Sequence, residues 1–421
     1  MHTALVSIGT DGDIFPYVGL GVALRARGHR VTLVASGHYE SLAQAHGFAF
    51  ETLVSAKENH ELFGHPDFWN PLKTAPLAAR WGVRFIERQY HLLAKLVTAD
   101  TVLVSNPGVL AAKLVQEKFG TPWANLILQP WMIPSSIAPP LMPGFVFLRH
   151  APRPVWKLFL RGLDVMGDAL MGREFNRVRA KFGLKPLRRI LSHWLSRQLV
   201  IGMFPEWYGQ PQADWPSQIR LTGFPMFDGG QNESLPPEVL DFCRAGTPPV
   251  AFTFGTGMAH SADLFRAALE ACAILGARGI FLTKYRDQLP ASLPASALHC
   301  AFAPFQKLFP QCAAVVHHGG IGTVAKALAT GTPQLIHPLC FDQIDNGART
   351  KGLGAGDYLR SSRSTGKQIA AALAGVMTAD TRARCRTLAT RFDKTDSLET
   401  TATLIETLAA ICFPVERLER R

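Results

Sequence analysis

Short apolar runs alternate with helical patterns over the first 130 residues of the chain. Strands are predicted where about four to eight apolar residues follow one another, and helices where apolar residues return every three or four positions. The predicted strands span 3–8, 30–35, 101–105 and 122–128, and the predicted helices span 16–27, 38–46 and 109–118. Strand followed by helix, repeated, is typical of a parallel, doubly wound sheet.

Proline and glycine positions agree with these boundaries. Pro16 suits the first turn of a helix, because its missing N–H would be unpaired there in any case. Gly28 and Gly47 suit the C-terminal caps of the helices before them, since glycine tolerates a left-handed backbone.

The pattern changes at 149–189, where helical segments carry eleven Lys and Arg residues against three acids. Apolar residues, among them Trp156, Leu163 and Met166, are interleaved with these bases. Such basic helices are compatible with peripheral contact to an anionic membrane. The simpler interpretation is a solvated helix face beside a pocket.

The second half of the chain repeats this architecture after a candidate linker at 222–237, which is rich in Gly, Pro and polar residues. Strands are predicted at 250–254, 279–283, 313–317 and 334–337, and helices at 261–275, 323–329 and 397–410. A chain of 421 residues fits two domains of about 200 residues each.

Charge and cysteine usage limit the possible partners. A net charge of +12 favours anionic ligands, but no nucleic-acid-binding motif accompanies the bases, so nucleic acid is not an expected partner. The seven cysteines are scattered without a CxxC pair, which favours reduced, buried thiols. No leader pattern or membrane-spanning run is present, so we expect a cytoplasmic protein, with peripheral attachment to the inner face of the membrane as an option.

The strongest local signal is the run 313–331, in which an apolar strand ends at His317 and His318 and a Gly-Gly-x-Gly-Thr turn opens a helix that closes at Gly331. Glycines let the backbone approach a ligand, and the free N–H groups of a helix N-terminus attract an anion. Thr323 adds a hydroxyl donor, and His318 can donate from its ring. The turn therefore predicts a phosphate-binding site.

Two common nucleotide-binding classes are disfavoured. The turn lacks the Gly-Lys-Ser/Thr ending of a P-loop, which argues against an ATPase. The first strand offers Gly9 and Gly12 rather than GxGxxG, and Ala35 and Ser36 stand where a dinucleotide fold places an acid.

Six segments together resemble the family 1 glycosyltransferases of the GT-B fold, and they extend over nearly the whole sequence. They are GTDGDIFP at 9–16, RGH at 27–29, TGFP at 222–225, FGT at 254–256, HGGIGT at 318–323 and DQIDN at 342–346. Within this family, the stretch 205–228 is most similar to the bacterial rhamnosyltransferases of rhamnolipid synthesis.

The resemblance implies two Rossmann-like α/β domains that face a cleft. It assigns 1–222 to an acceptor-binding domain, 223–396 to a nucleotide-sugar-binding domain, and 397–421 to a helix that returns to the first domain. It implies an inverting, metal-independent transfer of a hexosyl group, rhamnose or glucose, from a dTDP- or UDP-sugar. The nucleotide sugar is then a co-substrate, and no cofactor is expected.

By the same resemblance, donor-binding residues can be carried over from the family's motifs. The diphosphate would be held by His318, Gly320, Gly322 and Thr323, with help from Thr256 on the facing turn. The full predicted donor set is Gly12, Gly255, Thr256, Phe302, Ala303, His318, Gly320, Gly322, Thr323, Asp342 and Gln343. Phe302 would stack on the base, and Asp342 and Gln343 would bind sugar hydroxyls. Lys326 stands where plant relatives place a glutamate on the ribose, which leaves the choice between UDP and dTDP open.

Asp13 is the predicted catalytic base, because a carboxylate at the end of the first strand could take the proton of the acceptor hydroxyl. The structural alternative is that Asp13 caps the helix that follows. Asp11 and Asp13 also spell DxD, a metal signature elsewhere, but further ligands are lacking and no metal is expected. Asn106 lies near the position where plant relatives orient a catalytic histidine, but no such pair is required here.

The loop after residue 128 is predicted to bind a hydrophobic acceptor, either a lipid or a small molecule, through Trp131, Ile133 and Ile137. A domain-packing loop is the alternative. His317 and His337, at strand ends, are interpreted as packing or hydrogen-bonding residues. Two other functions remain open: a sugar-nucleotide epimerase of the same fold, and a non-catalytic partner that binds a nucleotide sugar or a membrane.

Overall fold

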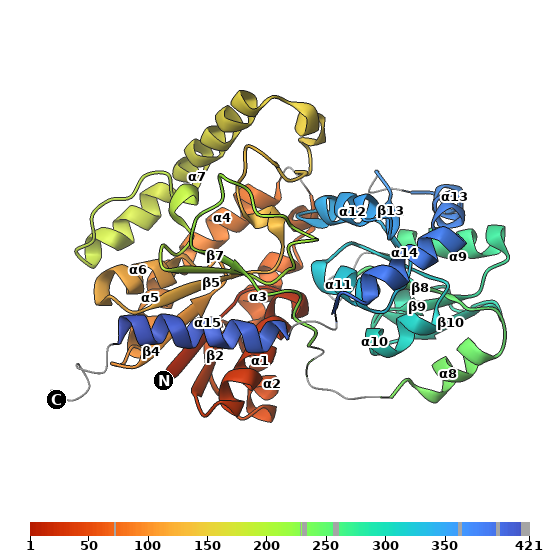
Figure 1. Ribbon diagram of the computed structural model, residues 1–421, viewed down its shortest axis with the longest axis horizontal. Coiled ribbons are helices and arrows are strands. Elements are labelled where there is room, and N and C mark those ends of the chain that lie inside the picture. The colour runs from red at the N-terminus through yellow and green to blue at the C-terminus, as the bar shows by residue number, and fades with distance from the viewer. Residues whose placement is uncertain are drawn as a thin grey trace. The chain divides into compact units, whose positions relative to one another are not determined.

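The computed structural model describes residues 1–70, 73–227, 229, 234–255, 261–360, 364–392 and 396–413. The chain folds into two compact units, each built on its own parallel sheet (Figure 1). Unit 1 comprises 1–140, 145–229 and 395–421, and unit 2 comprises 141–144 and 230–394.

Unit 1 contains a seven-stranded sheet in the order β3-β2-β1-β4-β5-β6-β7, and every paired neighbour is parallel. Its strands are β1 (His2–Val6), β2 (Arg30–Ser36), β3 (Ala49–Val54), β4 (Thr101–Ser105), β5 (Trp123–Ile127), β6 (Leu199–Gly202) and β7 (Ile219–Leu221). The central strands β1, β4 and β5 are buried along their whole length. A sheet covered on both faces requires such continuous apolar strands.

Eight described helices belong to unit 1, and all but the last lie between its strands along the chain. They are α1 (Asp11–Ala26), α2 (Glu40–Ala45), α3 (Ala56–Phe63), α4 (Thr74–Arg84), α5 (Ile86–Lys95), α6 (Leu110–Phe119), α7 (Arg153–Lys181) and α15 (Ser397–Cys412). Short 3-10 helices span Gly37–Tyr39, Pro66–Trp69, Pro130–Met132, Val146–His150 and Leu191–His193. One core cluster joins Leu103 of β4 to Leu93 of α5, Leu114 of α6 and Phe175 of α7.

The predicted start of the first helix is wrong, because α1 begins at Asp11 and Pro16 lies in its second turn. Thr10 is the N-cap, and its backbone N–H donates to Asp13 Oδ2 at 2.9 Å. This bond starts the helix earlier than the proline suggested. The capping glycines are confirmed, with left-handed φ angles of 82° at Gly28 and 69° at Gly47.

Strands β3, β6 and β7 were not predicted from the sequence. β3 has the sequence AFETLV and is mostly exposed, so its pattern is not that of a buried strand. β7 has only three residues and none is fully buried. β3 and β7 are the edge strands of the sheet, where the hydrophobic signal is weak because only part of the surface faces the core. β6 is an interior, fully buried strand, but it has only four residues.

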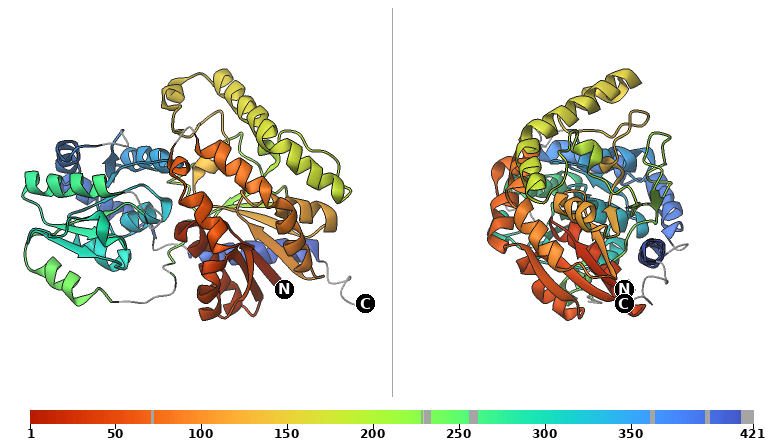
Figure 2. Two further views of the ribbon diagram at one scale, coloured as in Figure 1. Left: turned by 180° about the vertical axis from the view of Figure 1, so that it is seen from behind. Right: turned by 90° about the vertical axis from the view of Figure 1, so that its left-hand side faces the viewer.

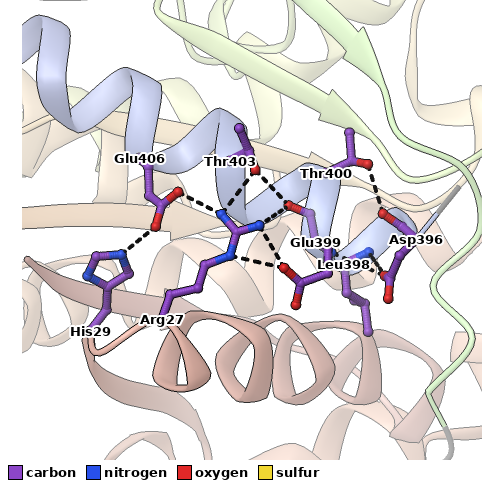
Figure 3. Close-up of polar contacts among 8 residues, drawn as sticks. All are labelled: Arg27, His29, Asp396, Leu398, Glu399, Thr400, Thr403 and Glu406. Atoms are coloured by element: carbon purple, nitrogen blue, oxygen red, sulfur yellow. Dashed lines mark hydrogen bonds and ion pairs between the residues drawn. The ribbon is translucent and has the colours of Figure 1, made fainter.

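Unit 1 extends past residue 222 to Gly229, and it includes the C-terminal helix. Phe227 packs against Gly19 of α1, where an added Cβ would lie 2.8 Å from the Phe227 Cβ. Helix α15 lies along α1, with Arg27 and His29 reaching three of its side chains (Figure 3). Arg27 donates to Glu399 Oε2 at 2.7 Å and to Glu406 Oε2 at 2.6 Å, and His29 Nε2 lies 2.7 Å from Glu406 Oε1.

Unit 2 contains a six-stranded parallel sheet in the order β10-β9-β8-β11-β12-β13. Its strands are β8 (Val250–Thr253), β9 (Gly279–Leu282), β10 (Ala297–Cys300), β11 (Ala314–His317), β12 (Gln334–Ile336) and β13 (Gly356–Tyr358). Its helices are α8 (Pro237–Arg244), α9 (Ala262–Leu275), α10 (Phe305–Leu308), α11 (Ile321–Ala329), α12 (Gln343–Gly352), α13 (Gly366–Val376) and α14 (Ala379–Ala389), with 3-10 helices at Arg286–Gln288 and Phe309–Gln311. Helices α9 and α13 pack together over a core that includes Phe252, Phe265 and Phe281.

Both units therefore have a doubly wound sheet, as predicted. In each sheet, the first strand of the unit lies beside the fourth. The second and third strands follow on one side of this pair, and the fifth and sixth follow on the other side. In such sheets, ligands bind beyond the carboxyl ends of the strands at this switch point. The switch point lies between β1 and β4 in unit 1, and between β8 and β11 in unit 2.

Two further sequence expectations can be compared with the described part of the chain. All seven cysteines are free thiols and six of them are buried. None of the described helices combines the length and apolar character needed to cross a bilayer.

Candidate functional site

The Gly-rich turn follows β11 at the switch point of unit 2, and Gly255 follows β8 at the same point. Gly319 has φ of 95° and Gly255 has φ of 99°, a left-handed backbone that other residues rarely adopt. The glycines are required here by conformation, independently of any ligand.

The His318 ring lies between Gly255 and Gly320. A Cβ on Gly320 would lie 2.5 Å from His318 Nε2, and one on Gly255 would lie 3.1 Å from His318 Cε1. Two glycines therefore make room for one imidazole, and any larger residue at Gly320 would displace it.

Burial lowers the pKa of His318 to about 4, so its ring is neutral near pH 7. Its Nδ1 atom is buried and has no hydrogen-bond partner among the described residues. A neutral imidazole carries one N–H, which can donate to an anion without adding a full positive charge.

Helix α11 begins directly after this histidine, with Gly320 as its N-cap. The N–H groups of Thr323 and Val324 donate to the Gly320 carbonyl at 3.0 and 3.1 Å. Those of Ile321 and Gly322, in the first turn, have no preceding helical carbonyl to bond. Gly322 is exposed, so this end of the helix is open to an anion.

His317 links the Gly-rich turn to the neighbouring strand β12 through hydrogen bonds of its ring. Its Nδ1 accepts the Gly319 N–H at 3.1 Å, and its Nε2 lies 2.9 Å from Gln334 Oε1. These two bonds place the ring proton on Nε2, facing the amide oxygen. Burial lowers the pKa of His317 to about 3, so His317 is a neutral hydrogen-bonding residue.

Asp342 and Gln343 stand at the start of α12, next to the same turn. Gln343 Oε1 accepts the N–H groups of Leu339 and Cys340 at 2.7 and 3.0 Å. Its oxygen is therefore engaged in holding the loop, which leaves the amide nitrogen for a ligand. Phe341, just before Asp342, has a left-handed backbone with φ of 52°.

Asn346 links this pair to the Gly-rich turn, a role that was not assigned from the sequence. Its Nδ2 donates to the Gly319 carbonyl at 2.9 Å and to Asp342 Oδ2 at 2.6 Å. Asn346 is fully buried, so the two predicted donor motifs form one hydrogen-bonded cluster. Its place in the DQIDN segment was the only sequence signal.

His337 follows β12 and is also fully buried. Its backbone N–H donates to the His317 carbonyl at 2.7 Å, but neither ring nitrogen has a partner among the described residues. Burial lowers the pKa of His337 to about 4. The ring thus presents two polar atoms that a bound ligand or water could satisfy.

The remaining predicted donor residues differ in exposure. The Phe302 side chain is 54% exposed after β10, whereas Ala303 is buried. Thr256 lies outside the described residues. Lys326 Nζ is 5.6 Å from the centroid of the Phe305 ring. The exposed ring of Phe302 is available to stack on a base, whereas Ala303 belongs to a core cluster of unit 2.

Asp13 lies at the switch point of unit 1, in the first turn of α1. Its Oδ2 accepts the N–H of Thr10 at 2.9 Å and the Thr10 hydroxyl at 3.3 Å. A Cβ on Gly9 would lie 2.1 Å from this oxygen, so only glycine lets the carboxylate fold back on the turn. Asp13 therefore does take part in capping, as the structural alternative proposed.

Capping does not prevent Asp13 from exchanging a proton. Burial raises the pKa of Asp13 to about 6, although the Thr10 bonds lower it, and Asp11 raises it further. A carboxylate with a pKa of about 6 is mostly ionised at pH 7 and is still basic enough for general-base catalysis. The same residue can start the helix and act on a substrate, because the Thr10 bonds engage only one of its oxygens.

The neighbours of Asp13 have structural partners. Asp11 Oδ1 accepts the Tyr39 hydroxyl at 2.9 Å. Asn106 follows β4 and donates to the Ile8 carbonyl at 2.8 Å and to Ser7 Oγ at 3.2 Å. Ser7 in turn donates to the Asp13 carbonyl at 3.1 Å. Asn106 thus holds the loop that carries Asp13.

The predicted acceptor loop is held by Asp214, which the sequence did not identify as a functional residue. Asp214 Oδ1 accepts the Ser135 hydroxyl at 2.8 Å, and Oδ2 accepts the Ser136 N–H at 2.7 Å. Burial would raise the pKa of Asp214, but these bonds outweigh it and lower the pKa. Asp214 stays ionised and fixes the loop.

The three predicted acceptor residues occupy different environments in this loop. Ile137 is 42% exposed, Trp131 is half-buried, and Ile133 is only 1% exposed. Ile133 is a packing residue, so the prediction of an apolar acceptor surface rests on Trp131 and Ile137.

Comparison with known proteins agrees with this geometry. Residues 3–132 match the glycosyltransferase family 28 N-terminal domain, and residues 273–397 match the C-terminal domain of erythromycin biosynthesis protein CIII-like proteins. The chain is 30% identical to the O-mycaminosyltylonolide 6-deoxyallosyltransferase of Streptomyces fradiae over 380 residues, which cover 84% of each protein.

Solved structures share the fold at lower identity. The spinosyn rhamnosyltransferase SpnG matches with a TM-score of 0.67 and 19% identity, covering 97% of this chain and 100% of that one. The glycosyltransferase VinC, solved in complex with DTDP, matches with a TM-score of 0.67 and 17% identity, covering 97% and 99%.

Proposed function

Since this protein belongs to the family 1 glycosyltransferases of the GT-B fold, we propose that it is an inverting, metal-independent hexosyltransferase. Its donor would be a dTDP- or UDP-sugar carrying rhamnose or glucose, and its acceptor a hydroxyl group on a hydrophobic molecule. The observation that carries the proposal is the open N-terminus of α11, with His318 beside it, at the switch point of unit 2.

The donor diphosphate would bind at this turn. Backbone N–H groups of Ile321 and Gly322, the Thr323 hydroxyl and the His318 ring are the available donors. When the sugar leaves, negative charge concentrates on the departing nucleoside diphosphate, and donors already in position stabilise it. Asp342 and the Gln343 amide would bind sugar hydroxyls, and Phe302 would stack on the base.

Asp13 would act as the general base. As the acceptor oxygen attacks the anomeric carbon, the hydroxyl proton passes to the second carboxylate oxygen of Asp13. A new C–O bond forms to the acceptor, and the bond from the anomeric carbon to the phosphate oxygen breaks, with its electron pair leaving on the nucleoside diphosphate. Attack from the opposite face inverts the anomeric centre.

A hydrophobic acceptor is supported by the loop that Asp214 holds, where Ile137 exposes an apolar side chain. The Streptomyces relative is named for transfer to O-mycaminosyltylonolide, and VinC was solved with DTDP. These names support a dTDP-sugar and a natural-product or lipid acceptor as the first substrates to test.

The test is to incubate the protein with dTDP-rhamnose, dTDP-glucose or UDP-glucose and a panel of macrolide aglycones, sterols, hydroxy-fatty-acid lipids and phenols. Nucleoside diphosphate release that depends on the acceptor, with a glycosylated product of inverted configuration, is the expected result. Isomerised donor formed without acceptor would assign an epimerase instead. Donor binding without any turnover across the panel would favour the non-catalytic alternative.

A further inference from the structure

The N-terminal half of α7 exposes several apolar side chains. The backbone of this helix can be followed along its length in Figure 2. Leu158 and Val165 are each 69% exposed, and Val155 and Met166 are 40% and 38% exposed. Phe147, in the 3-10 helix just before α7, is 77% exposed. Exposed side chains of this size, grouped on one element, indicate an interaction surface.

The spacing of these residues places them on one face of the helix. At about 3.6 residues per turn, Val155, Leu158, Gly162, Val165 and Ala169 fall along a single line, with Met166 at its edge. Every residue on this line is apolar or glycine.

The opposite face of α7 is the one that packs on the unit. Trp156 is buried and donates its Nε1–H to the Leu148 carbonyl at 3.1 Å. A Cβ on Gly167 would lie 2.9 Å from Leu191 Cγ, and Phe175 is fully buried in the core. The outward stripe is therefore additional to the apolar face that folding requires.

Unpaired cations lie next to this stripe. Arg149, Lys157 and Arg161 are exposed, and within the described part of the chain no hydrogen bond or ion pair engages them. The nearby acids are engaged elsewhere. Asp164 accepts the Ser192 N–H at 2.9 Å, and Asp168 accepts the N–H of Arg189 at 2.8 Å.

The C-terminal half of α7 differs, although its sequence is equally basic. Arg177 and Lys181 pair with Glu87 at 3.3 and 2.9 Å. Arg179 is buried and pairs with Glu117 at 2.7 Å. Arg173 is exposed, but no large apolar side chain is exposed among the described residues 170–189. Free cations and exposed apolar side chains therefore occur together at 146–169, which covers the first part of the basic region and the residues just before it.

We propose that residues 146–169 form a docking surface for an anionic lipid bilayer, with α7 lying in the plane of the interface. Exposed aliphatic side chains would enter the boundary of the acyl chains, while Lys157 and Arg161 would reach the headgroups with their long stems along the apolar surface. Charge complementarity selects an anionic membrane over a neutral one.

A bilayer fits this surface better than a protein partner does. Protein interfaces are enriched in Tyr, Trp and Arg at their centre, whereas the stripe is aliphatic and its cations lie at its side. The surface also continues toward the predicted acceptor loop, since Arg153 Nε donates to Ser136 Oγ at 3.2 Å. Docking here would bring that loop to the membrane.

The test is co-sedimentation of the full-length protein with vesicles of phosphatidylcholine alone or with phosphatidylglycerol. We expect binding to the anionic vesicles that weakens with added salt. The double substitution Leu158→Glu with Val165→Glu should reduce it at least tenfold. The double substitution Lys157→Glu with Arg161→Glu should also weaken binding to anionic vesicles. The expected loss of affinity is about fivefold or more for each of the two charges.

Two variants serve as matched controls in unit 2. Ile274→Glu changes an apolar side chain that is 51% exposed, and Arg244→Glu changes an exposed cation at the end of α8. Both should bind vesicles like the wild type. All variants alter exposed side chains. Each is to be checked for correct folding by circular dichroism and thermal unfolding before vesicle binding is compared.

Several results would overturn the proposal. These are absence of wild-type binding at any lipid composition, equal binding to neutral vesicles, or equal loss of binding in the controls. A wild-type dimer that the Leu158 and Val165 variant converts to a monomer, without vesicle binding, would assign the surface to a second copy of the protein. Vesicle binding is measured without substrates. The membrane proposal can therefore be refuted while the proposed transferase activity is confirmed, and the reverse is also possible.

Discussion

At the switch point of unit 1, burial acts on a carboxylate, and at the switch point of unit 2 it acts on imidazoles. The pKa of Asp13 is raised to about 6, whereas those of His318 and His337 are lowered to about 4. Desolvation favours the neutral form in each case. The acid is thereby brought into the range where it can exchange a proton, and the bases are removed from it.

Buried ionisable groups therefore differ between two units whose first six strands have the same order. Under the proposed function, proton transfer would belong to unit 1, while unit 2 would supply neutral hydrogen-bond donors that keep one protonation state near neutral pH. Glycine makes both arrangements possible. Gly9 lets Asp13 fold back on its turn, and Gly255 and Gly320 leave room for the His318 ring.

The strongest test of this comparison is Asp13→Asn. The amide keeps the shape of the turn but cannot accept a proton, so kcat should fall by about 100-fold to 10,000-fold while the donor Kd stays the same. Asp11→Asn, on the same turn, is the matched control and should retain turnover. Steady-state kinetics with donor titration by calorimetry separate the two effects; weaker donor binding, or unchanged kcat, would refute the base assignment.

In unit 2, His318→Ala and Gly320→Ala should weaken donor binding through the same ring. The first removes the imidazole, and the second displaces it, since a Cβ would lie 2.5 Å from His318 Nε2. Loss of a hydrogen bond to a charged group predicts a Kd about tenfold to a hundredfold higher. Gly352→Ala is the control, because nothing lies within 4 Å of the position that the added Cβ would occupy. Normal donor affinity in both variants would contradict the phosphate role of His318.

The pH dependence should separate the two units directly. Below a pKa of about 6, Asp13 takes up a proton, so kcat should fall about tenfold by pH 5. Donor affinity should stay nearly constant from pH 5 to 8, because His318 titrates at about 4. These profiles can be recorded on one set of samples, and a donor Kd that changes near pH 6 would place a titrating group in unit 2.

The pH dependence of the free energy of unfolding should show that buried His337 is held neutral. The folded-state pKa of His337, about 4, lies below its ordinary value of 6.5, so the unfolded state binds more protons between these values. The neutral His337 ring therefore contributes to stability fully above pH 6.5, and this contribution is lost as the pH falls toward 4. The wild-type free energy of unfolding should be lower at pH 5 than at pH 7, in part because of His337. In His337→Leu this difference between the two pH values should be smaller by roughly 1 to 2 kcal/mol. Urea denaturation at both pH values measures this, and an unchanged difference would show that the ring is not held neutral.

Much of the fold could be predicted from local patterns. The strands from β1 to β5, apart from β3, were placed to within a few residues, because buried parallel strands form unbroken apolar runs. The Gly-rich turn and the closing Gly331 could also be identified, since their backbone conformation depends on the glycines themselves. Pro16 misled the prediction, because the bond from Thr10 to Asp13 starts the helix before the proline.

The sequence by itself determined two doubly wound sheets, the position of the Gly-rich turn, the carboxylate after the first strand and the resemblance to a family. Tertiary structure alone decided which groups meet: Asp214 with Ser136, Asn346 with Gly319, and Arg179 with Glu117. It also decided that Ile133 is buried and that the first half of α7 combines free cations with exposed apolar side chains. The reason is physical, because propensity and periodicity depend on neighbours along the chain. Burial, pKa and hydrogen-bond pairing depend on residues that folding brings together from distant positions.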